Sequence, residues 1–355
     1  MRVGVNILPL ETGHKSRGIG YYTENLISSL EKEEEIIVSK FIDQGKLNEV
    51  DLVHYPWFDF FFHSLPIQKK FPTIVTIHDV IPLIFKDQYP IGIKGLFNFF
   101  LQKIALSSCK FIVTDSEVSR SDIVKHLKID SAKVKVVHLA SDKQFRVLQD
   151  KDLVFTKRKY KLPDEYILYV GDANWTKNLA FLIEGFKHII EDRQFSDLKL
   201  VLIGGVFLKN VENIDHPELE SLKKVNRLIK EYNLEQLVIR PGKLVDQELV
   251  AFYNLATIYV QPSLYEGFGI PILQSFACGT PVVSSDRGSL KEVGGNAAVY
   301  FDPTNATQFV EIAKDILRDK SLQHKLSQLG LKRASQFSWE KFSKEMKNIY
   351  LRVVR

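Results

Sequence analysis

Apolar residues in the first half of the chain fall into short runs, separated by longer segments with helical periodicity. Strands are expected at Val3–Leu8, Leu52–Tyr55, Thr73–His78, Phe111–Thr114 and Val134–His138, and helices at Tyr21–Lys32, Lys94–Ser108 and Ser119–Leu127. The strand runs are apolar on both faces, which is typical of strands that helices cover on both sides. The pattern therefore predicts a parallel sheet built from strand–helix–strand units.

The same rhythm begins again at Tyr166 and continues through the second half. Strands are expected at Tyr166–Asp172, Leu198–Gly205, Leu237–Gly242, Ala256–Ser263 and Thr280–Asp286, and helices at Leu179–Glu191, Pro217–Tyr232, Asp246–Leu255, Pro271–Ala277 and beyond. The segment Ser141–Pro163 is charged and poorly periodic, so we expect it to be a linker. The predicted fold class is α/β, with two Rossmann-like, doubly wound domains at residues 1–160 and 161–337.

Composition agrees with two globular domains. The chain has 355 residues, 45% hydrophobic and 26% charged, which excludes a disordered, collagen-like or disulfide-stapled protein. The net charge of +5, from 48 basic and 43 acidic residues, is too small to indicate nucleic-acid binding. Cys109 and Cys278 lack metal-binding spacing and suit a reducing compartment. We expect a cytoplasmic protein, because the N-terminus has the pattern of a strand and prolines interrupt the uncharged stretch Gly267–Ser285.

The segment PSLYEGFGIPILQSFACGTPVVSS (Pro262–Ser285), which overlaps the end of a predicted strand, is the most informative motif. Gly267 and Gly269 let the backbone approach a ligand, and a helix beginning near Pro271 offers free N–H groups to a phosphate. Glu266 beside that helix start can accept hydrogen bonds from sugar hydroxyls. By local chemistry alone, an ordinary strand–helix turn with an exposed glutamate explains the segment equally well.

This segment resembles the signature of family 4 glycosyltransferases of the GT-B fold, PSxxEGFGxPxxEAxAxGxPVV. Also similar to that family are SRGIGYYTENLISSL (Ser16–Leu30), TIHDVIPLIF (Thr76–Phe85) and YVGDANWTKNLAFLIEGF (Tyr169–Phe186). The resemblance covers almost the whole chain, and the order and spacing of its pieces make it specific. It implies a retaining, metal-independent hexosyltransferase with two Rossmann-like domains facing a cleft, and a C-terminal helix at 338–355 that crosses back to the N-terminal domain.

The resemblance implies roles for single residues. Glu266 would hold hydroxyls of the transferred sugar, Lys177 would neutralise the donor diphosphate, and His78 would contact the sugar near the reacting carbon. Further substrate-binding residues would be Gly18, Gly20, Asp79, Gly171, Gly267, Phe268, Gly269, Ile270 and Gln274. Without the resemblance, Lys177 is more simply a solvated helix-start residue and His78 a structural one. The resemblance implies no cofactor. It also implies no side-chain base, because the leaving phosphate accepts the proton of the acceptor hydroxyl.

Two positions depart from the family pattern. Gln274 stands where the family has a second glutamate for the nucleotide ribose, and its amide can bond a hydroxyl but carries no charge. Asp172 stands where an arginine is common, and an acid beside a diphosphate is unfavourable. The candidates for the missing cation are Arg17, Arg240 and Arg287. These departures favour one alternative, a catalytically weak or silent GT-B protein that binds sugar nucleotides or acts as a scaffold subunit.

Two weaker signals lie outside these motifs. Asp150 and Asp152 have the spacing of a metal-binding DxD pair, but they fall in the predicted linker, so we interpret them as surface charge. The aromatic segments Trp57–Phe62 and Phe97–Phe100, with lysines nearby, are explained mainly by core packing. The alternative is a docking surface for a lipid-linked acceptor.

The expected partners are a nucleotide-sugar donor and a glycan or lipid-linked oligosaccharide acceptor, with peripheral contact to the cytoplasmic membrane face. GDP-mannose is the first expectation for the donor, because TIHDVIPL and GDANWTKN resemble segments of enzymes of bacterial surface-polysaccharide assembly. A GT-B sugar-nucleotide epimerase is a further alternative, but it is not expected to carry the Glu266 loop.

Overall fold

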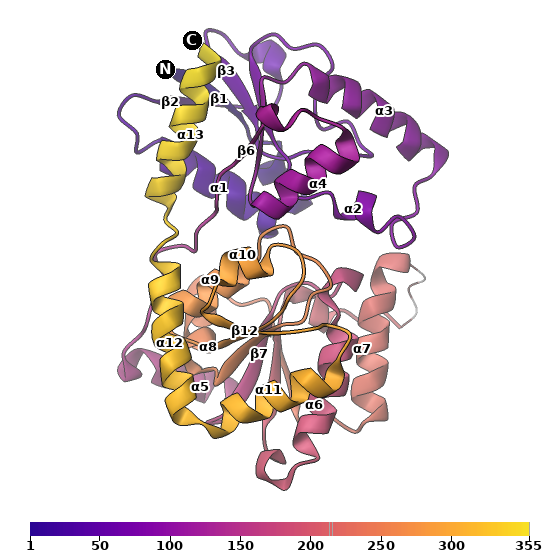
Figure 1. Cartoon of the computed structure of the whole chain (residues 1–355), viewed down its shortest axis with the longest axis vertical. Helices are drawn as coiled ribbons and strands as arrows, with labels where there is room; N and C mark the ends of the chain where they lie inside the picture. The colour runs from indigo at the N-terminus through magenta and orange to yellow at the C-terminus, as the bar shows by residue number, and fades with distance from the viewer. Residues whose placement is uncertain (213, 215, 355) are drawn as a thin grey trace. The chain divides into compact units, whose positions relative to one another are not determined.

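The computed structural model describes residues 1–212, 214 and 216–354, and the chain divides into two compact units (Figure 1). The first unit is Met1–Ala140 with Phe337–Arg355, and the second is Ser141–Gln336. Each unit contains one six-stranded sheet in which every pair of neighbouring strands is parallel. The predicted α/β class with two Rossmann-like units is thereby confirmed.

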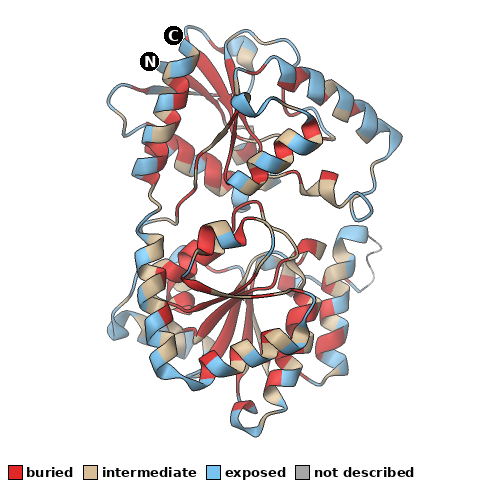
Figure 2. Cartoon of the chain, viewed as in Figure 1, coloured by how far each residue is buried: buried red, intermediate tan, exposed pale blue. Residues whose placement is uncertain are grey.

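The first unit has the strand order β2-β1-β3-β4-β5-β6. Its elements are β1 (Arg2–Asn6), α1 (Gly18–Leu30), β2 (Ile37–Phe41), β3 (Leu52–Tyr55), β4 (Thr73–Thr76), α2 (Ile81–Ile84), α3 (Ile93–Ser107), β5 (Phe111–Thr114), α4 (Glu117–Leu127), β6 (Val134–Val136) and α13 (Trp339–Val354). Every residue of β3 and β4 is buried, as expected for strands covered on both faces (Figure 2).

The last helix, α13, packs on α1 and β3 of the first unit. Its buried residues Trp339, Phe342, Met346 and Tyr350 recur at helical spacing and form one apolar face. The Tyr350 hydroxyl lies 2.7 Å from Nδ1 of the buried His54 on β3. Packing and this hydrogen bond together place the end of the chain in the unit where the chain begins.

The second unit has the strand order β12-β11-β10-β7-β8-β9. Its elements are α5 (Asp150–Tyr160), β7 (Tyr166–Val170), α6 (Leu179–Ile190), β8 (Lys199–Ile203), α7 (Glu220–Glu231), β9 (Val238–Gly242), α8 (Asp246–Leu255), β10 (Ile258–Gln261), α9 (Ile270–Ala277), β11 (Val282–Ser285), α10 (Leu290–Gly294), β12 (Ala298–Phe301), α11 (Ala306–Arg318) and α12 (Lys320–Ala334). Helix α6 packs against α7 and α11, whereas α5, α8, α9 and α12 pack in succession against one another.

Aromatic packing fixes part of the second core. The rings of Phe181 and Phe301 stack with centroids 5.6 Å apart, and Phe309 packs against both. A Cβ on Gly185 would lie 2.5 Å from the Phe309 ring, so α6 needs a glycine there to approach α11. These contacts hold the helices against the sheet that positions the candidate site.

The structure corrects three sequence-based expectations. Residues 150–160 of the predicted linker form helix α5, which belongs to the second unit: Lys159 and Tyr160 both bond Glu248 of α8, at 2.5 and 3.0 Å. The boundary between the units therefore falls at 140/141, 20 residues before the expected position. Strands β2 and β12 were not predicted. Only Phe41 is buried in β2, and only Ala298 and Phe301 are buried in β12, so both lack the continuous burial that marks the inner strands.

Candidate active site

Strands β10 and β7 are neighbours in the second sheet although they are distant in sequence. From β7 the chain continues to β8 and β9 on one side, and it then returns to build β10, β11 and β12 on the other. The loops after β7 and β10 thus leave the sheet side by side, at the point where the strand order reverses. Such a point is where open α/β sheets bind their ligands.

Backbone and amide hydrogen bonds join these two loops. The Leu264 amide donates to the Thr176 carbonyl at 2.7 Å, and the Asn178 side chain donates to the Pro262 carbonyl at 3.2 Å. Asn178 has a φ of 54°, a left-handed conformation that asparagine tolerates better than most residues. It ends the short helical turn Trp175–Lys177 and starts α6, which fixes the direction of the Lys177 side chain.

The structure brings two predicted site residues, Lys177 and Glu266, into direct contact. The Lys177 ammonium lies 2.7 Å from Oε1 and 2.9 Å from Oε2 of Glu266. Their side chains are only 20% and 12% exposed, so water screens the pair less than it would a surface ion pair. Lys177, expected at the diphosphate, and Glu266, expected at the sugar, therefore form one partly buried ion pair.

Two further donors hold the Glu266 carboxylate. Gln261 Nε2 and Ser263 Oγ donate to Oε1 at 2.8 and 2.7 Å. The Tyr259 hydroxyl donates to Oε1 of Gln261, which turns the amide nitrogen toward Glu266. Burial, together with the nearby Glu266 charge, raises the pKa of Tyr259 well above its usual value, so this hydroxyl stays protonated. Glu266 Oε2 accepts from Lys177 alone among the described residues, which leaves it a lone pair for a ligand hydroxyl.

The residue that precedes α10 fixes the glycine-containing loop after Glu266. Ser289 Oγ lies 3.0 Å from the Glu266 carbonyl and 2.9 Å from the Phe268 carbonyl. Gly269 caps α9 with a φ of 100°, a conformation that favours glycine, and a Cβ there would lie 2.9 Å from Leu290. Helix α9 then starts at Ile270, and its first-turn N–H groups lie beside the Glu266 loop. That the predicted loop Gly267–Ile270 binds substrate stays a prediction.

His78 lies in the first unit, just after β4. Its Nδ1 lies 2.7 Å from Oδ2 of Asp115, which follows β5, and its Nε2 lies 3.2 Å from the Pro56 carbonyl, which follows β3. The ring of Tyr22 packs edge-on against it at 4.7 Å between centroids. Both ring nitrogens face acceptors, so this arrangement favours the doubly protonated imidazolium. Burial alone would lower the pKa of His78, but the charge and hydrogen bond of Asp115, with Asp79 and the Pro56 carbonyl, raise it overall.

Asp115, like Gln261 and Ser263, was not predicted from the sequence as a site residue. It is 3% exposed, and its second carboxylate oxygen is buried without a hydrogen-bond partner among the described residues. The available signal was an acid directly after a predicted strand, at the same edge of the sheet as His78. Asp79 has a local role, because its Oδ1 accepts from the Ile81 amide at 2.9 Å and closes the turn into α2.

The predicted glycine loop lies at the start of α1. Arg17 is exposed and caps this helix, and a Cβ on Gly18 would have no neighbour within 4 Å. A Cβ on Gly20 would lie 2.4 Å from the Lys15 carbonyl oxygen, so the chain's own backbone requires a glycine there. Gly171 directly follows β7, and a Cβ there would lie 2.8 Å from the Tyr169 hydroxyl.

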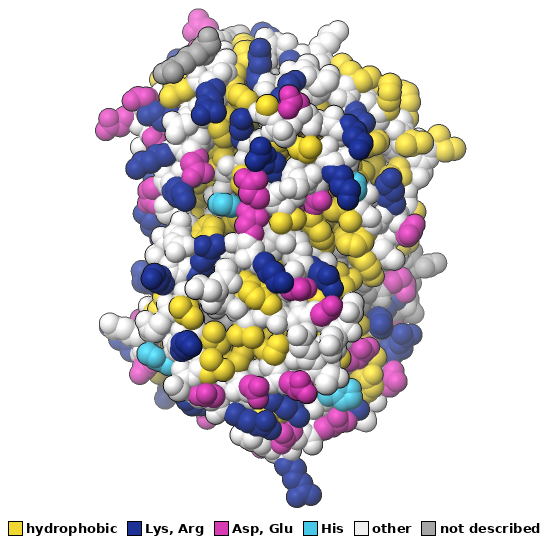
Figure 3. All heavy atoms as spheres, viewed as in Figure 1, with side chains coloured by type: hydrophobic (Ala, Val, Ile, Leu, Met, Phe, Trp, Pro, Cys, Tyr) yellow, Lys and Arg dark blue, Asp and Glu magenta, His cyan; other side chains and the backbone are white. Residues whose placement is uncertain are grey.

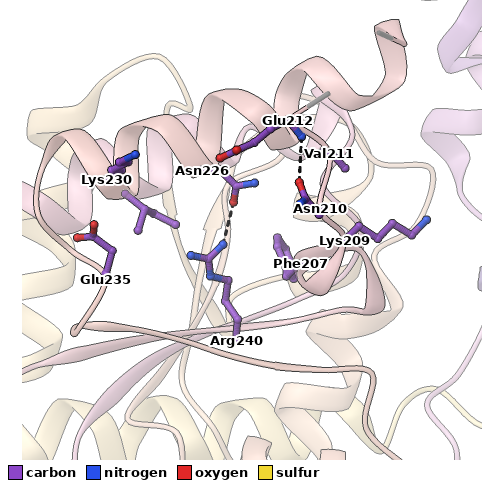
Figure 4. A pocket seen from close by; sticks show the side chains of 10 residues that line it. Phe207, Lys209, Asn210, Val211, Glu212, Asn226, Lys230, Glu235 and Arg240 are labelled. Atoms are coloured by element: carbon purple, nitrogen blue, oxygen red, sulfur yellow. Dashed lines mark hydrogen bonds between the residues drawn. The ribbon is translucent and has the colours of Figure 1, made fainter. Parts of the chain in front are cut away.

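Arg240 does not join the Lys177–Glu266 cluster. It lies on β9 and lines a cavity of about 320 Å³, together with α7 and the loop after β8 (Figure 4). The cavity is lined by Phe207, Lys209, Asn210, Val211, Glu212, Asn226, Ile229, Lys230, Glu235 and Arg240, and it includes no other predicted site residue. The Arg240 guanidinium donates to Oδ1 of Asn226 at 2.8 Å and points at α7.

The other departures from the family pattern have partners of their own. Gln274 is only 9% exposed, and its Oε1 accepts from the buried Tyr253 hydroxyl at 3.1 Å. Asp172 Oδ1 accepts from the Ala173 amide at 2.7 Å and stabilises the turn after β7. Arg287 pairs with Asp302 at 2.9 Å and also with the preceding acid. Lys177 is thus the cation that the structure places at Glu266.

Asp150 and Asp152 lie in the first turn of α5, where acids stabilise the helix dipole. Among the described residues, no group of three His, Cys, Asp or Glu side chains is arranged to hold a metal ion. Within the same residues, no helix is both long enough and apolar enough to cross a bilayer.

Two family models match the chain. The model of the glycosyl transferases group 1 matches residues 150–333, and the model of Glycosyltransferase Family 4 matches residues 36–145. The chain belongs to the glycosyl transferases group 1. The resemblance noted in the sequence is therefore confirmed, and the Lys177–Glu266 cluster lies inside the region that the first model matches.

Similar curated proteins include two mannosyltransferases of Escherichia coli. The chain is 29% identical over 281 residues to the serotype-specific mannosyltransferase WbdA, covering 78% of this chain and 33% of the relative. It is 28% identical over 280 residues to O-antigen chain mannosyltransferase B, covering 78% and 69%. This glycosyltransferase-family chain thus spans about a third of WbdA.

Solved structures support the same fold. Sucrose-phosphate synthase from Thermosynechococcus elongatus has a TM-score of 0.78 at 17% identity, covering 99% of this chain and 98% of the other. Anabaena Alr3699/HepE, in complex with UDP and glucose, has a TM-score of 0.75 at 14% identity, covering 98% and 99%. The GT-B fold expected from the sequence is confirmed.

Proposed function

We propose that this protein transfers a mannosyl unit from a nucleotide-diphosphate sugar, GDP-mannose first, to a glycan or lipid-linked oligosaccharide. The observation that carries the proposal is the Lys177–Glu266 ion pair at the switch point of the second sheet. It combines a cation suited to phosphate oxygens with a carboxylate suited to sugar hydroxyls. The transfer is proposed to retain the anomeric configuration and to need no metal.

Lys177 would act mainly on the leaving group. As the glycosidic bond breaks, negative charge grows on the departing diphosphate, and a fixed ammonium stabilises that charge more than it stabilises the ground state. The Thr176–Leu264 hydrogen bond and the Asn178 contacts keep the ammonium in place before the reaction. Glu266, held by Gln261 and Ser263, would accept a hydrogen bond from a sugar hydroxyl at Oε2 and so orient the transferred ring.

The mannosyl assignment is supported by the relatives. The two E. coli proteins above are mannosyltransferases, and a third relative is the O-antigen chain mannosyltransferase RfbU of Salmonella typhimurium, 26% identical over 255 residues. GDP is the proposed nucleotide, because mannose is commonly carried by GDP. A UDP-sugar is the competing donor, because HepE is a structural neighbour solved with UDP-glucose.

A second candidate function is a sugar-nucleotide-binding protein without transfer. It is favoured by Gln274, whose amide oxygen is engaged by Tyr253, and by Asp172 in place of an arginine. Such a protein would bind the donor through Lys177 but lack one charge that stabilises the transition state.

The test is a donor screen with two readouts. Purified protein is mixed with GDP-mannose, UDP-glucose and dTDP-sugars in the presence of EDTA, and binding is followed by calorimetry while nucleoside diphosphate release is followed enzymatically. We expect GDP-mannose to bind and turn over, and NMR of the product to show a retained configuration. Lys177→Ala should lose both signals, whereas Lys187→Ala, which removes a lysine paired with Glu191 on the surface of α6, should keep them. Binding without release would support the silent protein, and release from UDP-glucose alone would reject the mannosyl assignment.

A further inference from the structure

Helix α3 carries a continuous stripe of exposed apolar side chains. Ile93, Leu96, Phe97, Phe100 and Ile104 are 92%, 62%, 61%, 62% and 42% exposed. Their spacing places them on one side of the helix, and we call this set the α3 stripe. Hydrophobic atoms gather on the surface over this part of the first unit (Figure 3), and Figure 2 shows α3 exposed along much of its length.

The opposite side of α3 is polar where a helix usually buries apolar residues. Asn98 and Gln102 are buried, at 8% and 0% exposure. Asn98 donates to the Phe61 carbonyl at 2.8 Å, and Gln102 exchanges hydrogen bonds with the Leu65 backbone, at 3.0 and 3.1 Å. These amides, with Ala105 and Leu106, fasten α3 to the unit. The α3 stripe is therefore left largely uncovered by the rest of the unit, and its apolar character needs another cause.

The charge around the α3 stripe is positive. From residue 52 to residue 114 the sequence contains six lysines and three aspartates, and from residue 88 to residue 114 it contains no acid at all. Lys94 and Lys103 are exposed on α3 itself, each three positions from a phenylalanine of the stripe. Lysine stems can lie along apolar surface while their ammonium groups reach outward, so these residues suit an anionic layer above an apolar one.

We propose that the α3 stripe docks this protein on an anionic lipid bilayer, with α3 lying in the plane of the interface. Apolar side chains flanked by lysines match the order of acyl chains and anionic headgroups at such a surface. The charge argues against a second copy of the chain as the occupant, because two positive faces would repel each other. The proposal does not depend on which sugar is transferred, and it would hold for the silent protein as well.

Vesicle flotation tests the proposal with the full chain. The probes are vesicles of phosphatidylcholine mixed with phosphatidylglycerol, and vesicles of phosphatidylcholine alone. Wild type should float with the anionic vesicles and much less with the neutral ones. Phe97→Ser/Phe100→Ser should weaken binding about tenfold for each ring removed. Lys94→Gln/Lys103→Gln should weaken it about fivefold for each lysine, on anionic vesicles only. All four residues are exposed, so these changes leave the core untouched.

The matched control is Val154→Ser/Phe155→Ser on α5, where the side chains are 45% and 69% exposed. It should float like wild type, and transfer to a water-soluble acceptor should be equal in all three double variants. This activity readout separates a failure of docking from a failure of the proposed function. The proposal is overturned if wild type fails to float with anionic vesicles. It is also overturned if the Val154/Phe155 variant loses as much vesicle binding as the Phe97/Phe100 variant. A third contrary outcome is that light scattering shows a wild-type dimer, the Phe97/Phe100 variant is a monomer, and neither wild type nor this variant binds vesicles.

Discussion

Lys177 and Glu266 should act as one unit, and a double-mutant cycle measures their coupling. The cycle consists of Lys177→Ala, Glu266→Gln and the double variant. Removing Lys177 leaves the Glu266 charge with only the neutral donors Gln261 and Ser263. Neutralising Glu266 leaves a partly buried ammonium without its carboxylate. Each single change therefore also removes the charged partner of the residue that remains. The double variant should lose little more stability and turnover than the worse single variant.

The structure sets the size of this coupling. A hydrogen bond to a charged group contributes about 1.5–3 kcal/mol, and Lys177 makes two such bonds from one nitrogen. We therefore expect a coupling of roughly 1–3 kcal/mol in the free energy of unfolding, and each kcal/mol corresponds to about 2–4 °C in the Tm of a unit of this size. In kcat/KM, a coupling of about 1.4 kcal/mol would appear as a tenfold deviation from multiplied single effects.

The assay is thermal unfolding and donor turnover for the three variants and wild type. The control cycle uses Lys187 on α6 and Glu191 directly after it, a surface pair at 2.8 Å, for which only a small effect on stability and none on turnover is expected. If the effects of Lys177→Ala and Glu266→Gln on turnover add within about 0.5 kcal/mol, the two residues act independently and the reasoning fails.

Further predictions concern His78, the metal requirement and helix α13. Asp115→Asn should lower the pKa of His78, because it removes the charge that outweighs burial; histidine NMR titration measures this, and an unchanged pKa would refute the assignment. The stability that His78 gains from protonation should be complete below the unfolded pKa of 6.5 and lost as pH rises through the raised folded pKa, so unfolding at several pH values should show wild type and Asp115→Asn converging at high pH. Donor turnover should persist in EDTA, because Lys177 supplies positive charge at the proposed diphosphate site; loss that Mg²⁺ restores would contradict this. Tyr350→Phe should cost about 1–3 kcal/mol of unfolding free energy, because it leaves Nδ1 of buried His54 without its partner, and a Tm equal to wild type would show that the α13 contact is dispensable.

The sequence alone was sufficient for the class of fold and for the most specific loop. Inner strands such as β7 and β10 bury both faces, so nearly all of their residues are apolar, and such runs are visible without any structure. The Glu266 loop could likewise be predicted, because its glycines and the proline in the first turn of α9 meet local backbone requirements. Strands β2 and β12 could not be predicted from the sequence, because partly buried strands do not require a continuous apolar run.

Tertiary structure decided which functional side chains meet. Lys177 and Glu266 are 89 residues apart, and His78 and Asp115 are 37 apart, so no local pattern relates the members of either pair. They meet because neighbouring parallel strands carry their following loops to one edge of a sheet, and strand order is a property of the whole unit. The same holds for Gln274, which contacts Tyr253 inside the unit, and for α3, whose amides face inward. Helical periodicity marks the apolar side of α3, but only packing against the rest of the unit determines which side is covered.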